Sequence, residues 1–242
     1  MNSEPQHQEH VGQRLERVRE QIAATAIRVN RKPEDITLVA VSKTHSAETI
    51  REAIAAGVTD LGENRVQEAD AKIPAVGRTL ARWHLIGHLQ SNKARRAVEL
   101  FDVIHSLDSA ALARRLDRMC GEIKRETLPV LIQVDLGKEA TKTGAAESEV
   151  LEIIEAIKQT STLRLKGLMT LPPYFDDPEK ARPFFRRLRE LRDELRAQGA
   201  FDDQGGELSM GMTHDFEVAI EEGATMVRVG TAIFGERGSQ TE

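Results

Sequence analysis

Cysteine is nearly absent from this chain, which has a single one, Cys120, among its 242 residues. No disulfide can therefore form within the chain, and no cluster of thiolates can bind a metal ion. Aromatic residues are also scarce, at 4%, so the core must consist mainly of aliphatic side chains. No apolar run approaches the roughly 20 residues of a transmembrane helix, and the polar N-terminus lacks the apolar stretch of a signal peptide. We therefore expect a cytoplasmic protein without a membrane partner.

The chain also has no excess of basic charge. Its 34 Lys and Arg residues are outnumbered by 39 Asp and Glu residues, for a formal net charge of −5. A nucleic-acid-binding protein usually carries a basic face or a high isoelectric point, so we expect no nucleic-acid partner. The stretch from Arg182 to Arg196 alternates basic with acidic residues, which is typical of a solvated helix face. No long apolar patch is evident in the sequence, which favours a monomer.

Short apolar segments alternate with helical patterns along the chain. Residues 1–8 are typical of a disordered tail, and apolar residues from Val11 to Ile22 then recur at helical spacing, which predicts an extra N-terminal helix to about Asn30. Eight strand candidates follow, and helical patterns separate them. These candidates are residues 36–43, 60–64, 82–88, 101–109, 128–135, 163–170, 206–212 and 224–235.

Strands that alternate with helices of this length predict βαβ units and a parallel sheet. Near-continuous apolar runs such as LVAV and VLIQV fit a sheet buried on both faces. Eight units in a chain of this length favour an α/β fold closed into a single (β/α)8 TIM-type barrel. An open doubly wound sheet is the alternative. Because no linker or break in composition is visible, we expect residues 9–242 to form one domain.

Active sites of such barrels lie at the carboxyl ends of the strands. Lys43 directly follows the first strand, and the alternation of side chains along a strand places it on the same face as Val39 and Val41. If those valines point into the barrel, the lysine does too. A lysine there is costly unless its charge is paired or lost, and a neutral amine can attack an aldehyde. An exposed lysine just beyond the strand is the alternative.

Two glycine- and hydroxyl-containing junctions stand near the seventh and eighth strands, where these barrels often bind phosphate. Residues 209–213 offer two hydroxyls and a glycine, and Gly230-Thr231 precede a short helical turn. Plain tight turns are the alternative. Arg228 shares a strand face with Gly230, and its partner could be a pyridine nitrogen or a carboxylate. Within the third strand candidate, His84 and His88 lie too far apart to chelate a metal, so we expect no metal site.

Motifs along nearly the whole chain are similar to those of one family. They are LVAVSKTHS, DLGENRVQEA, WHLIGHLQSNKAR, HSLDS, VLIQVDLGKEATKTG, LKGLMTLPP, LSMGMTHDFEVAI and VRVGTAIFGER. In these motifs the chain resembles the pyridoxal-phosphate homeostasis protein family. The resemblance implies a fold-type III barrel that binds pyridoxal 5′-phosphate (PLP), like the N-terminal domain of alanine racemase. It also implies that Lys43 carries PLP as a Schiff base.

The resemblance assigns the other site residues as well. Asn64 and His84 would lie near the cofactor, Ser209 with Gly230 and Thr231 would hold the phosphate, and Arg228 would face the pyridine nitrogen. The chain departs from the family at Thr213, where serine is common, and at Asp135, where asparagine is common. Thr213 keeps a hydroxyl, whereas an inward-facing Asp135 would weaken the binding of an anion.

The resemblance implies that the protein buffers PLP, or delivers it to PLP-requiring apo-enzymes, in vitamin B6 homeostasis. We expect no catalytic residue and no robust catalytic activity. An arginine at the pyridine nitrogen disfavours its protonation and makes the ring a weaker electron sink. Two alternatives remain, a PLP-dependent amino-acid racemase and an unrelated phosphate-binding barrel enzyme.

A racemase needs a second acid/base opposite the lysine. Racemases with this barrel take it from an additional C-terminal domain, which the sequence is expected to lack, since it ends soon after the eighth strand candidate. The sole tyrosine, Tyr174, follows the sixth strand candidate.

Overall fold

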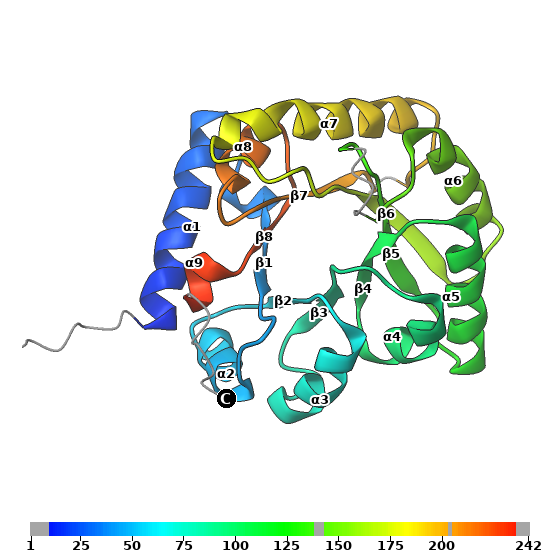
Figure 1. Ribbon diagram of the computed structural model, residues 1–242, viewed down its shortest axis with the longest axis horizontal. Coiled ribbons are helices and arrows are strands. Elements are labelled where there is room, and N and C mark those ends of the chain that lie inside the picture. The colour runs from blue at the N-terminus through cyan, green and yellow to red at the C-terminus, as the bar shows by residue number, and fades with distance from the viewer. Residues whose placement is uncertain (1–9, 138–142, 203–204, 236–242) are drawn as a thin grey trace, which may run out of the picture.

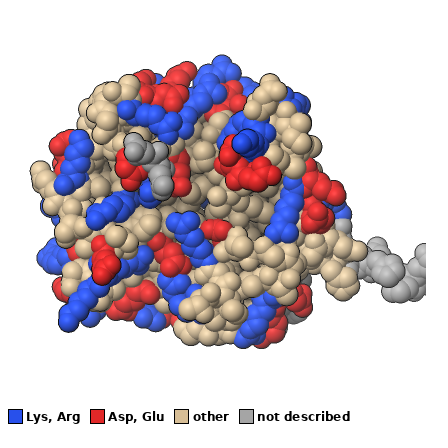
Figure 2. Space-filling view, turned by 180° about the vertical axis from the view of Figure 1, so that it is seen from behind, with Lys and Arg blue, Asp and Glu red and all other residues tan. Residues whose placement is uncertain are grey.

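The computed structural model describes residues 10–137, 143–202 and 205–235. The expected disordered tail, residues 1–8, lies outside the described residues. Within the described ranges, no helix has both the length and the apolar character needed to cross a bilayer. On the face that Figure 2 shows, acidic and basic side chains are interspersed, in keeping with the small net charge of the chain.

Eight parallel strands form a closed barrel in which each strand pairs with its neighbours in sequence and β8 pairs with β1 (Figure 1). This closure confirms the expected (β/α)8 barrel and excludes the open sheet. The strands are β1 Thr37–Val41, β2 Asp60–Glu63, β3 Arg82–Leu85, β4 Val103–Leu107, β5 Leu128–Gln133, β6 Leu163–Met169, β7 Glu207–Met212 and β8 Met226–Val229.

Helices surround the strands in Figure 1, and α1 lies alongside the α8 and α9 segments at the end of the chain. The helices are α1 Val11–Arg28, α2 Ala47–Ala55, α3 Val66–Val76, α4 Ala94–Leu100, α5 Ala110–Glu122, α6 Val150–Lys158, α7 Arg182–Ala197, α8 Phe216–Glu221 and α9 Thr231–Phe234. Short 3-10 turns are η1 Pro33–Asp35, η2 Ser91–Lys93, η3 Glu147–Glu149 and η4 Pro178–Ala181.

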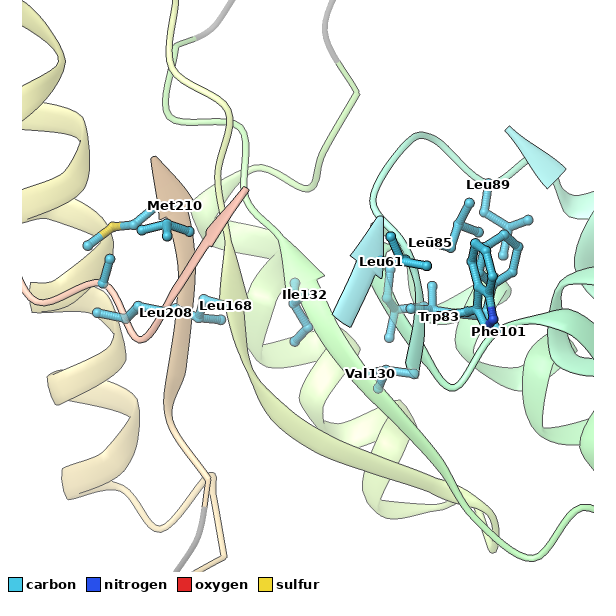
Figure 3. Close-up of a cluster of buried hydrophobic side chains, with 14 of the residues drawn as sticks. Leu61, Trp83, Leu85, Leu89, Phe101, Val130, Ile132, Leu168, Leu208 and Met210 are labelled. Carbon is cyan, nitrogen blue, oxygen red and sulfur yellow. The ribbon is translucent and has the colours of Figure 1, made fainter. Parts of the chain in front are cut away.

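Alternation along the strands divides the buried side chains into two layers. Outward-facing residues pack against the helices in one large apolar cluster, part of which Figure 3 shows around Leu61, Trp83 and Phe101. Inside the barrel lies a separate small apolar cluster of Val103, Leu131 and Met169. Buried polar side chains also lie in the interior, and they are described with the site below.

Several elements are shorter than the sequence predicts, and backbone conformation gives the reason. The first helix ends at Arg28 rather than near Asn30, because Asn30 adopts a positive φ of 56°. The first strand ends at Val41, because the chain turns at Thr44, where φ is 67°. Ser46 then caps α2 by accepting a hydrogen bond from the Thr49 amide at 3.3 Å.

Candidate functional site

A cavity of about 560 Å³ opens at the carboxyl ends of the strands. This size suits a small organic ligand. Its described lining residues come from most of the strand-to-helix junctions of the barrel. They are Val41, Lys43, Thr44, His45, Asn64, Ile86, Gly87, Leu171, Tyr174, Met212, Thr213, His214, Arg228, Gly230, Thr231 and Gly235.

Lys43 stands in the turn after β1 and lines the cavity together with Val41, two residues earlier. Side-chain alternation therefore continues just past the strand end, as the sequence predicts. The side chain is half-buried. Among the described residues it has no hydrogen-bond or ion-pair partner, so its amine is open to the cavity contents.

A buried ion pair supports the backbone next to Lys43. The Lys72 ammonium lies 2.7 Å from Glu63 Oε1 and donates to the Ser42 carbonyl oxygen at 2.9 Å. The Ser42 hydroxyl donates to the same Glu63 oxygen at 2.7 Å. Burial raises the pKa of Glu63, and the Lys72 ammonium opposes that rise. These contacts join β1, β2 and α3, so they fix the position of the turn that presents Lys43.

Asn64 lines the cavity from the end of β2, and its backbone touches the next strand junction. A Cβ atom at Gly87 would lie 2.2 Å from the Asn64 carbonyl oxygen, so no other residue fits there without moving this backbone. Among the described residues, the Asn64 side chain has no hydrogen-bond partner. Its amide is therefore available to a ligand.

Thr213, Gly230 and Thr231 also line the cavity. The Gly230 amide donates to Thr213 Oγ1 at 3.3 Å, which joins the junctions after β7 and β8. A Cβ at Gly230 would lie 3.2 Å from the Val41 carbonyl oxygen, so this glycine allows close approach to β1.

The next helix, α9, is held from outside. Arg14 of α1 donates to the carbonyl oxygens of Ile233 and Phe234 at 2.7 and 3.3 Å. The N-terminal helix, which is an addition to the eight repeating units, thus fixes the junction after β8.

Arg228 lines the cavity with a guanidinium that is almost fully buried. Its Nη1 donates to Ser209 Oγ at 2.6 Å and its Nη2 to the Thr170 carbonyl oxygen at 2.9 Å. Burial lowers the pKa of Arg228 to about 10, so the side chain remains cationic at neutral pH. Ser209 is fully buried and is not among the described residues that line the cavity.

His84 is also fully buried and is likewise not among the described lining residues. Its Nε2 lies 2.8 Å from Asp60 Oδ1, and its Nδ1 lies 2.8 Å from Nε2 of His105. The structure therefore brings Lys43, Asn64, Arg228, Gly230 and Thr231 together on one cavity, while it places His84 and Ser209 in the barrel interior.

The sequence did not indicate that His45 and His214 line the cavity, whereas Tyr174 was considered from the sequence as an acid/base of a racemase. His45 stacks on Phe234, with ring centroids 4.9 Å apart, and Tyr174 packs against His214 at 5.5 Å. The three lining residues follow strands in irregular segments, where no periodicity indicates which way a side chain points. Asp135 is not among the described residues that line the cavity, and its carboxylate accepts a hydrogen bond from the Gly137 amide at 3.1 Å.

Residues 14–238 match the family model described as the alanine racemase N-terminal domain. The chain is 44% identical over 225 residues to the "Pyridoxal phosphate homeostasis protein" of Aquifex aeolicus, covering 93% of this chain and 97% of that protein. It is 42% identical over 233 residues to the protein of the same name from Escherichia coli K12, covering 94% and 97%.

Among solved structures, the chain is similar to PipY of Synechococcus elongatus with PLP bound. The TM-score is 0.82 and the identity 40%, over 93% of this chain and all of that one. An alanine racemase from Clostridium difficile has a TM-score of 0.68 at 16% identity, over 92% of this chain and 60% of that one. The second likeness shows the shared barrel fold alone.

Proposed function

The chain belongs to the family of the pyridoxal phosphate homeostasis proteins, and on this premise we propose that it binds PLP in the cavity of Lys43 and carries it as a Schiff base on that side chain. The observation that carries the proposal is the meeting of Lys43, Asn64, Arg228, Gly230 and Thr231 on one cavity. The PLP reported in the PipY structure supports it.

The donors around the cavity fit the chemistry of this ligand. The open Lys43 amine suits an aldehyde. The Thr213 hydroxyl and the backbone at Gly230 and Thr231 suit a phosphate, since glycine permits the close approach of an anion. Arg228 would face the pyridine nitrogen with a cation that cannot accept a proton.

The proposal changes the roles that the resemblance implied for His84 and Ser209. Neither lines the cavity among the described residues, but both are linked through hydrogen bonds to Arg228, which does. We therefore place them beneath the ligand as supports. Thr213 lines the cavity, so we propose that its hydroxyl, rather than that of Ser209, contacts the phosphate.

Storage is favoured over catalysis by the charge next to the proposed ring position. When bound, PLP supplies an electron sink whose strength depends on protonation of its ring nitrogen. The Arg228 cation would disfavour that protonation, because like charges repel. The protein would thus hold the cofactor without robust catalytic turnover, buffering it in vitamin B6 homeostasis.

Borohydride reduction followed by peptide mass spectrometry tests the proposal. In PLP-saturated protein we expect a reduced pyridoxyl adduct on Lys43 and a visible absorbance band before reduction. Lys43→Ala should lose both, whereas Lys32→Ala, at an exposed lysine outside the cavity, should keep both. A saturated protein without an adduct on Lys43 would refute the proposal.

Racemisation is a second candidate because Tyr174 lines the same cavity as Lys43. A tyrosine at that wall could act as the second acid/base of a two-sided proton transfer. The test is turnover of L-alanine by PLP-loaded protein. A rate on the order of 1 s⁻¹ or more, lost in Tyr174→Phe, would favour the racemase over storage.

The proposal extends to a monomer that acts in the cytoplasm and delivers PLP to apo-enzymes. Reactivation of a PLP-requiring apo-enzyme by the loaded protein, compared with an equal amount of free PLP, tests delivery. The molar mass in solution, measured by light scattering after size-exclusion chromatography, tests the monomer. The mass of a dimer would contradict it.

A further inference from the structure

A continuous row of hydrogen bonds crosses the barrel interior beneath the cavity. It runs from Arg228 to Ser209 at 2.6 Å, from Ser209 to His105 Nδ1 at 2.9 Å, from His105 to His84 at 2.8 Å and from His84 to Asp60 at 2.8 Å. Its members come from β8, β7, β4, β3 and β2. Asp60 borders a second cavity, of about 400 Å³, at the amino ends of β1 and β2.

The direction of every bond in this row follows from its Asp60 end. An ionised carboxylate can only accept, so Nε2 of His84 donates to Asp60. Nδ1 of a neutral His84 then accepts, and Nε2 of His105 donates to it. Nδ1 of a neutral His105 accepts in turn, so the Ser209 hydroxyl donates to it. A guanidinium can only donate, so Ser209 Oγ accepts from Arg228.

The protonation states agree with this direction. Burial lowers the pKa of His84 despite the opposing effect of Asp60, and burial lowers the pKa of His105 well below its ordinary value. Burial opposes ionisation of Asp60, but the hydrogen bond from His84 holds its pKa below the ordinary value. Both rings are therefore neutral at neutral pH. The charged groups that act on the two rings are Asp60, Arg82, Asp102 and Arg228.

We propose that Asp60, His84 and His105 are positioning residues, which act through Ser209 to fix the guanidinium of Arg228 at the wall of the PLP cavity. If either histidine were protonated or in the other tautomer, two donors or two acceptors would face each other within the row. A proton on Nδ1 of His105 would leave the Ser209 hydroxyl without its acceptor, so Ser209 Oγ would no longer be held in place to accept from Arg228. The effect on PLP rests on the proposed function, whereas the order of donors does not.

Nitrogen-15 NMR of the imidazole rings tests the order of donors in protein prepared without PLP. We expect His84 and His105 to be neutral Nε2–H tautomers at pH 7, with signals assigned by their loss in His84→Phe and His105→Phe. An Nδ1–H tautomer or an imidazolium at either ring at this pH would overturn the proposal.

PLP affinity tests the positioning role. His105→Phe keeps a ring of similar size but removes both hydrogen bonds, and we expect about tenfold weaker binding, the cost of about one hydrogen bond. His88→Phe is the matched control, because His88 is 45% exposed and stands outside the row, and it should stay within about twofold of the wild type. Wild-type affinity in folded His105→Phe would overturn the role.

A second pair of variants covers the case in which His105→Phe does not fold. Ser209→Ala removes the acceptor of Arg228 and should also weaken PLP binding about tenfold, whereas Ser209→Thr keeps the hydroxyl and should restore most of it. Equal affinity of Ser209→Ala and wild type would overturn the proposal. If the wild type itself bound no PLP, the proposed function would fail, but the imidazole tautomers would still decide the order of donors.

Discussion

The mouth of the barrel and the interior beneath it hold polar side chains in opposite ways. At the mouth, Lys43 and Asn64 have no hydrogen-bond partner among the described residues, although both line the cavity. Below it, His84 and His105 each have a partner at both ring nitrogens. We infer that the unpaired side chains at the mouth are available to a ligand, whereas the paired side chains below it hold their neighbours in place.

Arg228 belongs to both regions, so its removal should have the largest effect. Arg228→Ala leaves the Ser209 hydroxyl and the Thr170 carbonyl oxygen without their donor. We expect a loss of about 2–4 kcal/mol in the free energy of unfolding, measured by urea denaturation without PLP, and more than tenfold weaker PLP binding. Arg95→Ala, which removes an exposed ion pair with Glu122, should cost less than about 1 kcal/mol. Equal losses of unfolding free energy in the two variants would show that the buried contacts of Arg228 stabilise the fold no more than an exposed ion pair does.

The interior should also make the protein sensitive to mild acid. Because burial lowers the pKa of His105 in the folded state, the unfolded chain binds a proton first. The stability that this residue contributes is complete above about pH 6.5 and is lost as the pH falls below it, by up to about 1.4 kcal/mol per pH unit.

Denaturation of wild type and His105→Phe at a series of pH values between 7.5 and 5.5 measures this loss. The wild type should lose more stability than the variant over that interval. If the free energies of unfolding of the two proteins differed by the same amount at every pH, His105 would bind protons equally in the folded and unfolded states.

Thr213 tests the cavity wall, where its Oγ1 accepts a hydrogen bond from the Gly230 amide at 3.3 Å. Thr213→Val removes a hydroxyl at the cavity wall while keeping the side-chain shape, so we expect about fivefold weaker PLP binding, equivalent to about 1 kcal/mol. The free energy of unfolding should change by less than about 0.5 kcal/mol. Thr213→Ser should bind PLP like the wild type, and a large loss of stability in Thr213→Val would place this residue with the paired side chains below the mouth instead.

Tyr174 should give the smallest effect. Its side chain is 73% exposed, and its packing against His214 lies at the rim. Tyr174→Ala should change the free energy of unfolding by less than about 0.5 kcal/mol and PLP affinity by less than about twofold, as measured by titration of the visible band. A tenfold loss of affinity would make the rim part of the binding surface.

The sequence predicted the inward faces of the strands better than the depth of each residue. The alternation in β1 correctly places Lys43 with Val41 at the cavity. The resemblance assigned Ser209 and His84 to the cofactor, but the structure buries both below the cavity, at a level that depends on strand tilt and stagger around the closed sheet. Those quantities arise from pairing between distant segments, such as β1 with β8, and no local pattern encodes them. His45 and Tyr174 lie in turns and loops, where alternation does not apply.

The ion pair behind the first strand has a chemical consequence for selectivity. Two amines flank Ser42, on Lys43 and Lys72, and an aldehyde reacts only with an amine that has a free electron pair. The nitrogen of Lys72 is engaged by the Glu63 carboxylate and by the Ser42 carbonyl oxygen, so a carbonyl compound could reach it only by breaking both contacts. A carbonyl compound entering this barrel would thus distinguish two chemically identical side chains by what already surrounds each nitrogen.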